Sequence, residues 1–128
     1  MLRTAHKHIP FSIRILLVLL WMGGIFIVSS VPSLQSELPS TVDFVLRKMA
    51  HMVEYFILTI LVWFVLIDRK IFFSTKYLTA GMISFLYAVS DEFHQRFVPG
   101  RYGTSTDVMI DSIGIIVALV VIFYTHKK

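Results

Sequence analysis

The chain has 128 residues, of which 56% are hydrophobic and 14% aromatic, and it carries a formal net charge of +4 with no cysteine. This length suits one compact unit, and the lack of cysteine excludes a disulfide framework and a thiolate metal site. The apolar stretches are almost continuous, so the composition excludes an ordinary soluble domain and indicates an integral membrane protein.

The charges are distributed unevenly between the two sides of the apolar segments. Basic residues dominate the amino end, the connection 68–76 and the carboxyl end, whereas acidic residues outnumber basic ones in 32–54 and 91–111. Lys and Arg typically mark the cytoplasmic ends of membrane segments. The pattern therefore predicts both termini in the cytoplasm, and it argues against nucleic acid as a partner.

The first membrane helix is predicted at about residues 14–31. Arg14 is expected to extend towards the cytoplasmic headgroups, and Pro32 to end the helix. A cleaved signal peptide is the competing interpretation, because a basic start, an apolar core and the small residues of 28–30 also fit one.

Three further helices are predicted, at about 41–67, 77–95 and 105–124. Capping boxes mark the start of two of them, Ser40 with Asp43 and Thr104 with Asp107, and the Pro99–Gly100 pair forces a turn after the third. The predicted fold class is an all-α membrane bundle of four helices, forming a single domain over residues 1–128.

The uncharged runs within the last three helices are short for a membrane. Tyr55–Ile67, Tyr77–Ser90 and Ser112–Tyr124 each cover about 20 Å, against a hydrocarbon core of about 30 Å. Helices that span the bilayer must therefore draw their flanking polar residues into its outer part. Ionisable groups at such depth usually have a partner or a function.

Helical spacing places these polar residues on stripes that should meet at one level. Glu92 points away from its stripe and is expected to pair with Arg96 in solvent, whereas Gly114 allows a close helix approach. The stripes consist of Lys48, His51, Glu54 and Tyr55 on the second helix, Tyr87, Asp91, His94 and Gln95 on the third, and Asp107, Asp111 and Gly114 on the fourth.

Several kinds of chemistry are compatible with these polar residues, and the spacing between them is not specific for any one kind. A divalent cation such as Zn²⁺, Mn²⁺ or Fe²⁺ is a candidate cofactor, the imidazoles and carboxylates could relay protons, and Lys48 with Arg101 could hold a phosphate. Structural roles compete: Asp107 as a cap, Lys48 as a headgroup anchor, and His51 with Glu54 as mutual partners. The candidate metal ligands are His51, Glu54, His94, Asp107 and Asp111, and the histidines expected to face solvent are His6, His8 and His126.

From about Leu16 to Leu119 the chain resembles the VanZ-like family. The resemblance rests on Ser29-Ser30-Val31-Pro32, Lys48-x-x-His51-x-x-Glu54-Tyr55, Tyr87-x-x-x-Asp91-Glu92-x-His94-Gln95-x-Phe97-x-Pro99-Gly100-Arg101 and Asp107-x-x-x-Asp111-x-x-Gly114. It implies a multi-pass protein of the bacterial cytoplasmic membrane and an association with teicoplanin resistance, without a defined reaction. Family members often carry Asn at the position of Asp111, so the acid here would add negative charge to a metal or proton site.

Three functions are compatible with these features. The first is an outward-facing pocket that binds or modifies an envelope lipid or a lipid-linked cell-wall component. In its enzymatic form, the general base is His51 or His94. The residues that hold a cation or orient water are Glu54, Asp91, Asp107 and Asp111. The residues that contact the ligand are Arg101, Lys48, Tyr55, Tyr87, Glu92 and Gln95. The second is a non-catalytic scaffold, and the third a proton-coupled carrier, which would require a homo-oligomer.

Overall fold

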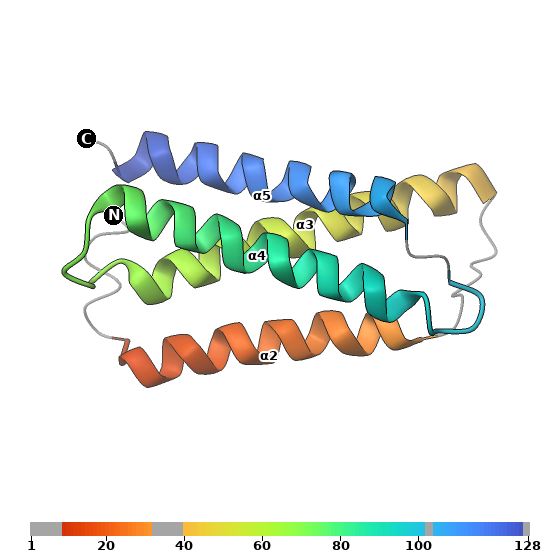
Figure 1. Ribbon diagram of the computed structural model, residues 1–128, viewed down its shortest axis with the longest axis horizontal. Helices are drawn as coiled ribbons and strands as arrows, with labels where there is room; N and C mark the ends of the chain where they lie inside the picture. Colours follow the sequence, from red (N-terminus) through yellow and green to blue (C-terminus); the bar gives the residue numbers. More distant parts are fainter. Residues whose placement is uncertain (1–8, 32–39, 102–103, 127–128) are drawn as a thin grey trace.

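The computed structural model describes residues 9–31, 40–101 and 104–126. Nearly all of them belong to four helices: α2 (Phe11–Ser30), α3 (Ser40–Leu66), α4 (Phe73–Gln95) and α5 (Ser105–His126). The helices run up and down, so α2 begins and α5 ends at the same end of the bundle (Figure 1). The predicted all-α four-helix bundle is confirmed.

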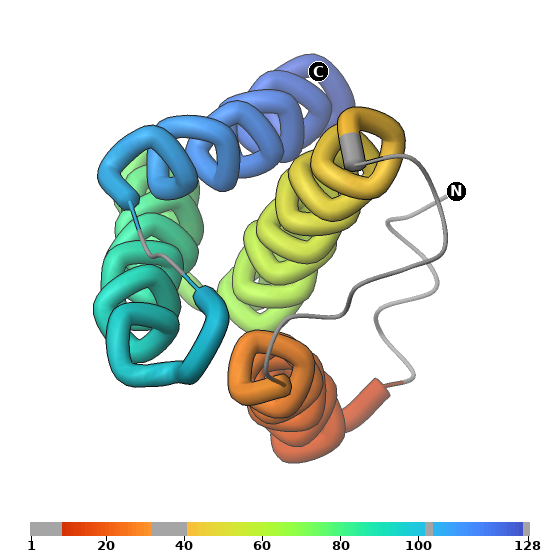
Figure 2. Tube along the Cα trace, turned by 90° about the vertical axis from the view of Figure 1, so that its right-hand side faces the viewer, coloured from red at the N-terminus to blue at the C-terminus, as the bar shows by residue number. Residues whose placement is uncertain are grey.

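Helix α3 is central to the packing. It lies along α5 over most of its length and also contacts α2 and α4, while α2 rests on α3 and α4 across the bundle from α5 (Figure 2). Large side chains of α3, among them Tyr55, Leu58 and Trp63, fill the interior. Small residues of α4, such as Ala80 and Ala88, let the neighbouring helices close around them.

The outer surface of the bundle is apolar. Side chains such as Leu20, Ile27, Leu78 and Phe93 are each at least 60% exposed, and an apolar surface of this extent is not stable in water. By length and composition α2, α3 and α5 can each cross a membrane. Helix α4 carries more polar residues and is not apolar enough to be included with them. The crossing by α4 and the cytoplasmic position of the termini stay predictions.

The bundle has two chemically different ends. The basic end, where α2 starts and α3 is joined to α4, carries Arg14, Arg69, Lys70 and Lys76. The acidic end, where α2 and α4 finish and α3 and α5 start, carries Glu54, Asp91, Glu92, Asp107 and Asp111. Figure 2 looks onto the acidic end.

The prediction that Arg14 extends to the headgroups is wrong. Helix α2 starts at Phe11, so Arg14 lies within its first turns and is only 5% exposed. Its Nη1 atom is 2.7 Å from Asp68 Oδ2 and donates a hydrogen bond of 3.2 Å to the Phe64 carbonyl oxygen. A buried guanidinium is tolerated because these partners replace its water.

Two more expectations at the basic end need correction. Helix α4 starts at Phe73 instead of Tyr77, and Lys76 in its first turn donates from Nζ to the Ile67 carbonyl oxygen at 2.7 Å across the connection. His126 does not face solvent freely, since its ring meets that of Trp63 edge to face at 5.2 Å. Expectations for Pro32, the Ser40 side chain, His6 and His8 lie outside the described residues.

Candidate functional site

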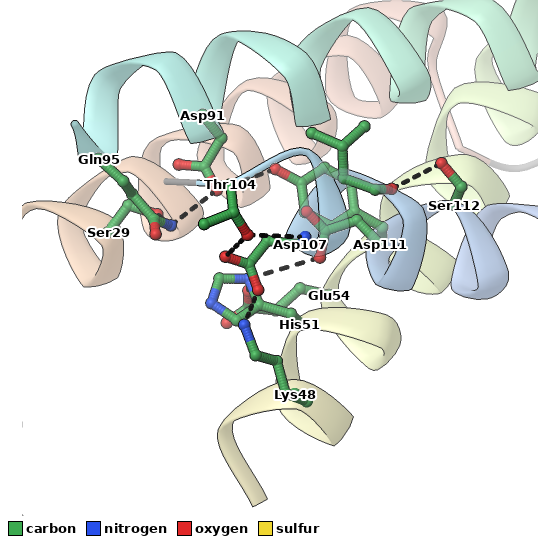
Figure 3. A network of polar contacts seen from close by, with 12 residues as sticks. Ser29, Lys48, His51, Glu54, Asp91, Gln95, Thr104, Asp107, Asp111 and Ser112 are labelled. Carbon is green, nitrogen blue, oxygen red and sulfur yellow. Dashed lines mark hydrogen bonds and ion pairs between the residues drawn. The ribbon is translucent and has the colours of Figure 1, made fainter. Parts of the chain in front are cut away.

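Helices α3 and α5 approach each other closely near the acidic end because Gly114 has no side chain. A Cβ atom at Gly114 would overlap the Met52 carbonyl oxygen and lie 3.1 Å from the Met52 Cα atom. The expected close approach at this glycine is thus confirmed. It brings the carboxylates of α5 against the polar stripe of α3, as Figure 3 shows for Asp107, Asp111 and His51.

The outermost contact of this group joins Lys48 to Asp107. The ammonium of Lys48 forms an ion pair with Asp107 Oδ1. The other carboxylate oxygen accepts a hydrogen bond of 2.9 Å from Thr104 Oγ1, and the Asp107 backbone N–H donates to that hydroxyl at 3.3 Å. Thr104 therefore caps α5, as the predicted pairing of Thr104 with Asp107 implied, and the Asp107 carboxylate holds both the Thr104 hydroxyl and Lys48.

Thr104→Ala should lower the free energy of unfolding by about 1 kcal/mol, because the first turn of α5 loses its side-chain cap. Thr104→Ser should retain most of the stability, since the hydroxyl is kept. Thermal unfolding in detergent, followed by circular dichroism, measures both variants. Equal loss in the two would contradict a capping role for the hydroxyl.

His51 lies between two carboxylates without a close hydrogen bond to either. Its Nδ1 atom is 3.5 Å from Glu54 Oε2 and 3.8 Å from Asp111 Oδ1. Both His51 Nδ1 and Asp111 Oδ2 are buried, and neither has a hydrogen-bond partner in the part of the chain that the structure describes. Buried polar atoms are normally paired, so this position has unused capacity to bind a polar group.

A second polar group links α2, α3 and α4. Tyr55 donates its hydroxyl to Asp91 Oδ2 at 3.1 Å. The Gln95 side-chain amide donates to the same oxygen at 3.4 Å and to Ser29 Oγ at 3.3 Å. Ser29, Asp91 and Gln95 lie close to Lys48 and Asp107 (Figure 3). Asp111 is close enough to Asp91 for the two carboxylates to interact electrostatically.

Two of the predicted site residues on α4 turn instead towards α2. His94 Nε2 is 3.0 Å from Ser30 Oγ, and its ring stacks on Phe26 with centroids 4.6 Å apart. Tyr87 donates its hydroxyl to the Met22 carbonyl oxygen at 2.6 Å. The predicted metal set is not assembled: within 9–31, 40–101 and 104–126, no three His, Asp or Glu side chains are arranged to hold an ion.

The expectation for Glu92 is wrong. Glu92 is 4% exposed, and one carboxylate oxygen, Oε2, has no hydrogen-bond partner among the described residues. It lies instead near the charged groups of Asp91 and Lys48 and beside the backbone of Thr104. Arg96 remains exposed, and none of the ion pairs found between described residues joins the two.

Arg101 also has a role that its sequence position did not suggest. Its Nε atom donates to the Val31 carbonyl oxygen at 2.9 Å, and a terminal nitrogen donates to the Val28 carbonyl oxygen at 3.1 Å. The side chain therefore hydrogen-bonds two carbonyl groups at the carboxyl end of α2. Trp21 was not singled out by sequence, although its Nε1 atom donates to the Glu54 carbonyl oxygen at 2.9 Å and fixes α2 on α3.

The interior of the acidic end is rich in negative groups. Asp91, Glu92, Asp107 and Asp111 are buried, whereas the cations nearest to them, Lys48 and Arg101, are only half-buried. Lys48 is paired with Asp107, and Arg101 contacts backbone carbonyls. The two cations proposed for a phosphate are thus engaged, and the surplus of carboxylates favours a ligand with a positive group.

Comparison with known proteins agrees with the resemblance found in the motifs. The family model described as VanZ/LLP1 matches residues 11–126. No curated protein and no solved structure matches the chain significantly. Since the family match runs through all four helices, and three of these can span a bilayer, the protein is a membrane protein that belongs to the VanZ/LLP1 family.

Proposed function

We propose that the acidic end binds the headgroup of an envelope lipid or of a lipid-linked cell-wall component at the outer face of the bacterial cytoplasmic membrane. One observation carries the proposal. Three buried polar atoms from three helices, His51 Nδ1, Glu92 Oε2 and Asp111 Oδ2, have no hydrogen-bond partner among residues 9–31, 40–101 and 104–126. A bound polar group would satisfy such atoms, which otherwise cost free energy.

The surroundings support a lipid as the source of that group. Apolar side chains cover the outside of all four helices, including Val45, Leu86 and Met109 near the acidic end. A headgroup at the level of Asp111 can therefore remain attached to acyl chains that lie along the bundle. Retention of a cell-wall precursor in this way would reduce its availability to teicoplanin, which links the site to the resistance implied by the family resemblance.

The experiment is lipid mass spectrometry, with elemental analysis, on protein purified in mild detergent, comparing wild type with Asp111→Ala. We expect a co-purified lipid in the wild type and at least about tenfold less in the variant, equal to about 1.4 kcal/mol of binding free energy. Asp43→Asn, which alters the ion pair with Arg47 in the first turns of α3, is the matched control and should retain the lipid.

A non-catalytic scaffold is the second candidate, favoured by the ion pair of Lys48 with Asp107 and by the caps of Thr104 and Arg101. These contacts hold helix ends together without any ligand. If Asp111→Ala lowers the unfolding temperature while the wild type carries no lipid, the scaffold is correct. Teicoplanin susceptibility of cells that express each variant then tells whether the scaffold itself alters resistance.

A further inference from the structure

The surface between α4 and α5 has a crevice at the acidic end. It has a volume of about 310 Å³, and its walls include Val89, Phe93 and Val108. Phe93 is 60% exposed on the outside of α4, so the apolar walls continue onto the surface that faces lipid. A molecule can therefore approach this crevice sideways, from the membrane.

Polar groups occur at one end of the same crevice. Glu92 contributes to its lining from α4, together with the exposed Arg96 one turn later, and Thr104 and Ser105 contribute from the start of α5. The Glu92 side chain is more than nine-tenths buried, and none of the residues that the structure describes offers a hydrogen bond to its Oε2 atom. A buried acceptor of this kind is best satisfied by a charged donor, and an ammonium is the compact one.

From these contacts we propose that the crevice binds an aminophospholipid, with its primary ammonium at Glu92 and its phosphate at Arg96 and Ser105. This assignment rests on the proposed function and names the class of lipid. The surplus of buried carboxylates at the acidic end favours the ammonium over an anionic headgroup. Arg96 and the first backbone N–H groups of α5 supply the complementary positive charge for the phosphate.

The two charges of the headgroup match the two sides of the crevice. The acid lies on its buried side and the arginine on its exposed side, one helical turn further along α4. The acyl chains then lie against Val89, Phe93 and Val108, which accept apolar groups. A headgroup without an amine leaves Glu92 Oε2 unsatisfied, and a quaternary amine offers it no N–H donor.

The test is native mass spectrometry of the full chain in detergent with an equimolar mixture of dioleoyl phosphatidylethanolamine, its N-methyl derivative, phosphatidylcholine and phosphatidylglycerol. We expect ethanolamine lipid to bind at least about tenfold more strongly than choline or glycerol lipid, which is the equivalent of one hydrogen bond to a charged group. The N-methyl lipid, which keeps two N–H donors, should fall between them.

Substitutions in the crevice test whether the preference for ethanolamine lipid arises there. Glu92→Gln should reduce the preference for ethanolamine lipid to within about twofold, and Arg96→Gln should weaken binding of all the phospholipids. Asp43→Asn and Arg69→Gln are controls of the same chemistry, and both lie away from the crevice. The headgroup series on the wild type needs no substitution, so it remains decisive even if Glu92→Gln fails to fold.

The outcomes separate this inference from the proposed function. Lipid binding that Asp111→Ala abolishes, without any headgroup preference in the wild type, overturns the aminophospholipid assignment and leaves the proposed function in place. Binding of none of the four phospholipids overturns the aminophospholipid assignment, and if no lipid co-purifies with the wild type either, the proposed function is overturned as well. A preference for phosphatidylglycerol also overturns the assignment, because it shows that the cations, and not Glu92, select the ligand.

Discussion

Gly114→Ala is expected to destabilise the protein by roughly 3 kcal/mol and to lower its unfolding temperature by about 10 °C. The added methyl group would overlap the Met52 carbonyl oxygen and press on the Met52 Cα atom. These are backbone atoms of α3, so no side chain can rotate away to make room. The two helices must separate, and the pairing of Lys48 with Asp107 across them should weaken as well.

The matched control is Gly23→Ala in the middle of α2, where a Cβ atom meets nothing within 4 Å. Alanine forms helix better than glycine, so this variant should be neutral or more stable by up to about 1 kcal/mol. Thermal unfolding of both variants in the same detergent measures the difference. A Gly114→Ala protein as stable as Gly23→Ala would contradict the close packing of α3 on α5.

Lys48→Met is the second substitution with a large expected effect, a loss of about 3 kcal/mol in the free energy of unfolding. The side chains of Lys48 and Asp107 are only 24% and 12% exposed. Removal of the ammonium leaves the Asp107 carboxylate unpaired, close to the buried Asp111. An uncompensated charge in such a position costs more than the ion pair itself contributes.

A neighbouring ion pair provides the control. Arg47 pairs with Asp43 one turn earlier on α3, and the two side chains are 41% and 14% exposed. Because the guanidinium is the more exposed cation and the pair lies within one helix, Arg47→Met should cost less, about 1 kcal/mol. Adding Asp107→Asn to Lys48→Met should restore part of the stability, because the unpaired charge is then removed. Equal losses for Lys48→Met and Arg47→Met would contradict the buried pairing.

Much of the fold followed from hydropathy alone. Four apolar segments separated by turn-forming residues predict four helices, and the structure has them with boundaries that differ by only a few residues. The concentration of acids at one end was also predictable, because the uncharged runs are too short to keep Glu54 and Asp111 out of the bundle. Gly114 was identified because a glycine in line with Asp107 and Asp111 indicates a helix contact.

The orientations of single side chains were predicted less well. Glu92 and Arg96 are spaced as a surface ion pair, yet Glu92 is buried between α4 and α5. His94 follows Asp91 by three residues, which suggests a common partner, but it contacts Ser30 and Phe26 of α2. Spacing fixes the angle between two side chains on one helix and leaves open which neighbour each of them meets.

The sequence by itself determined the membrane character, the four helices and the end of the bundle at which the acids and His51 gather. These properties depend on local composition and on the length of apolar runs, which are independent of the neighbouring helices. Only the tertiary structure decided that Lys48 pairs with Asp107, that Arg14 and Glu92 are buried, and that a crevice opens between α4 and α5. The reason is that helix rotation and separation are set by packing, here above all by the contact of Gly114 with Met52.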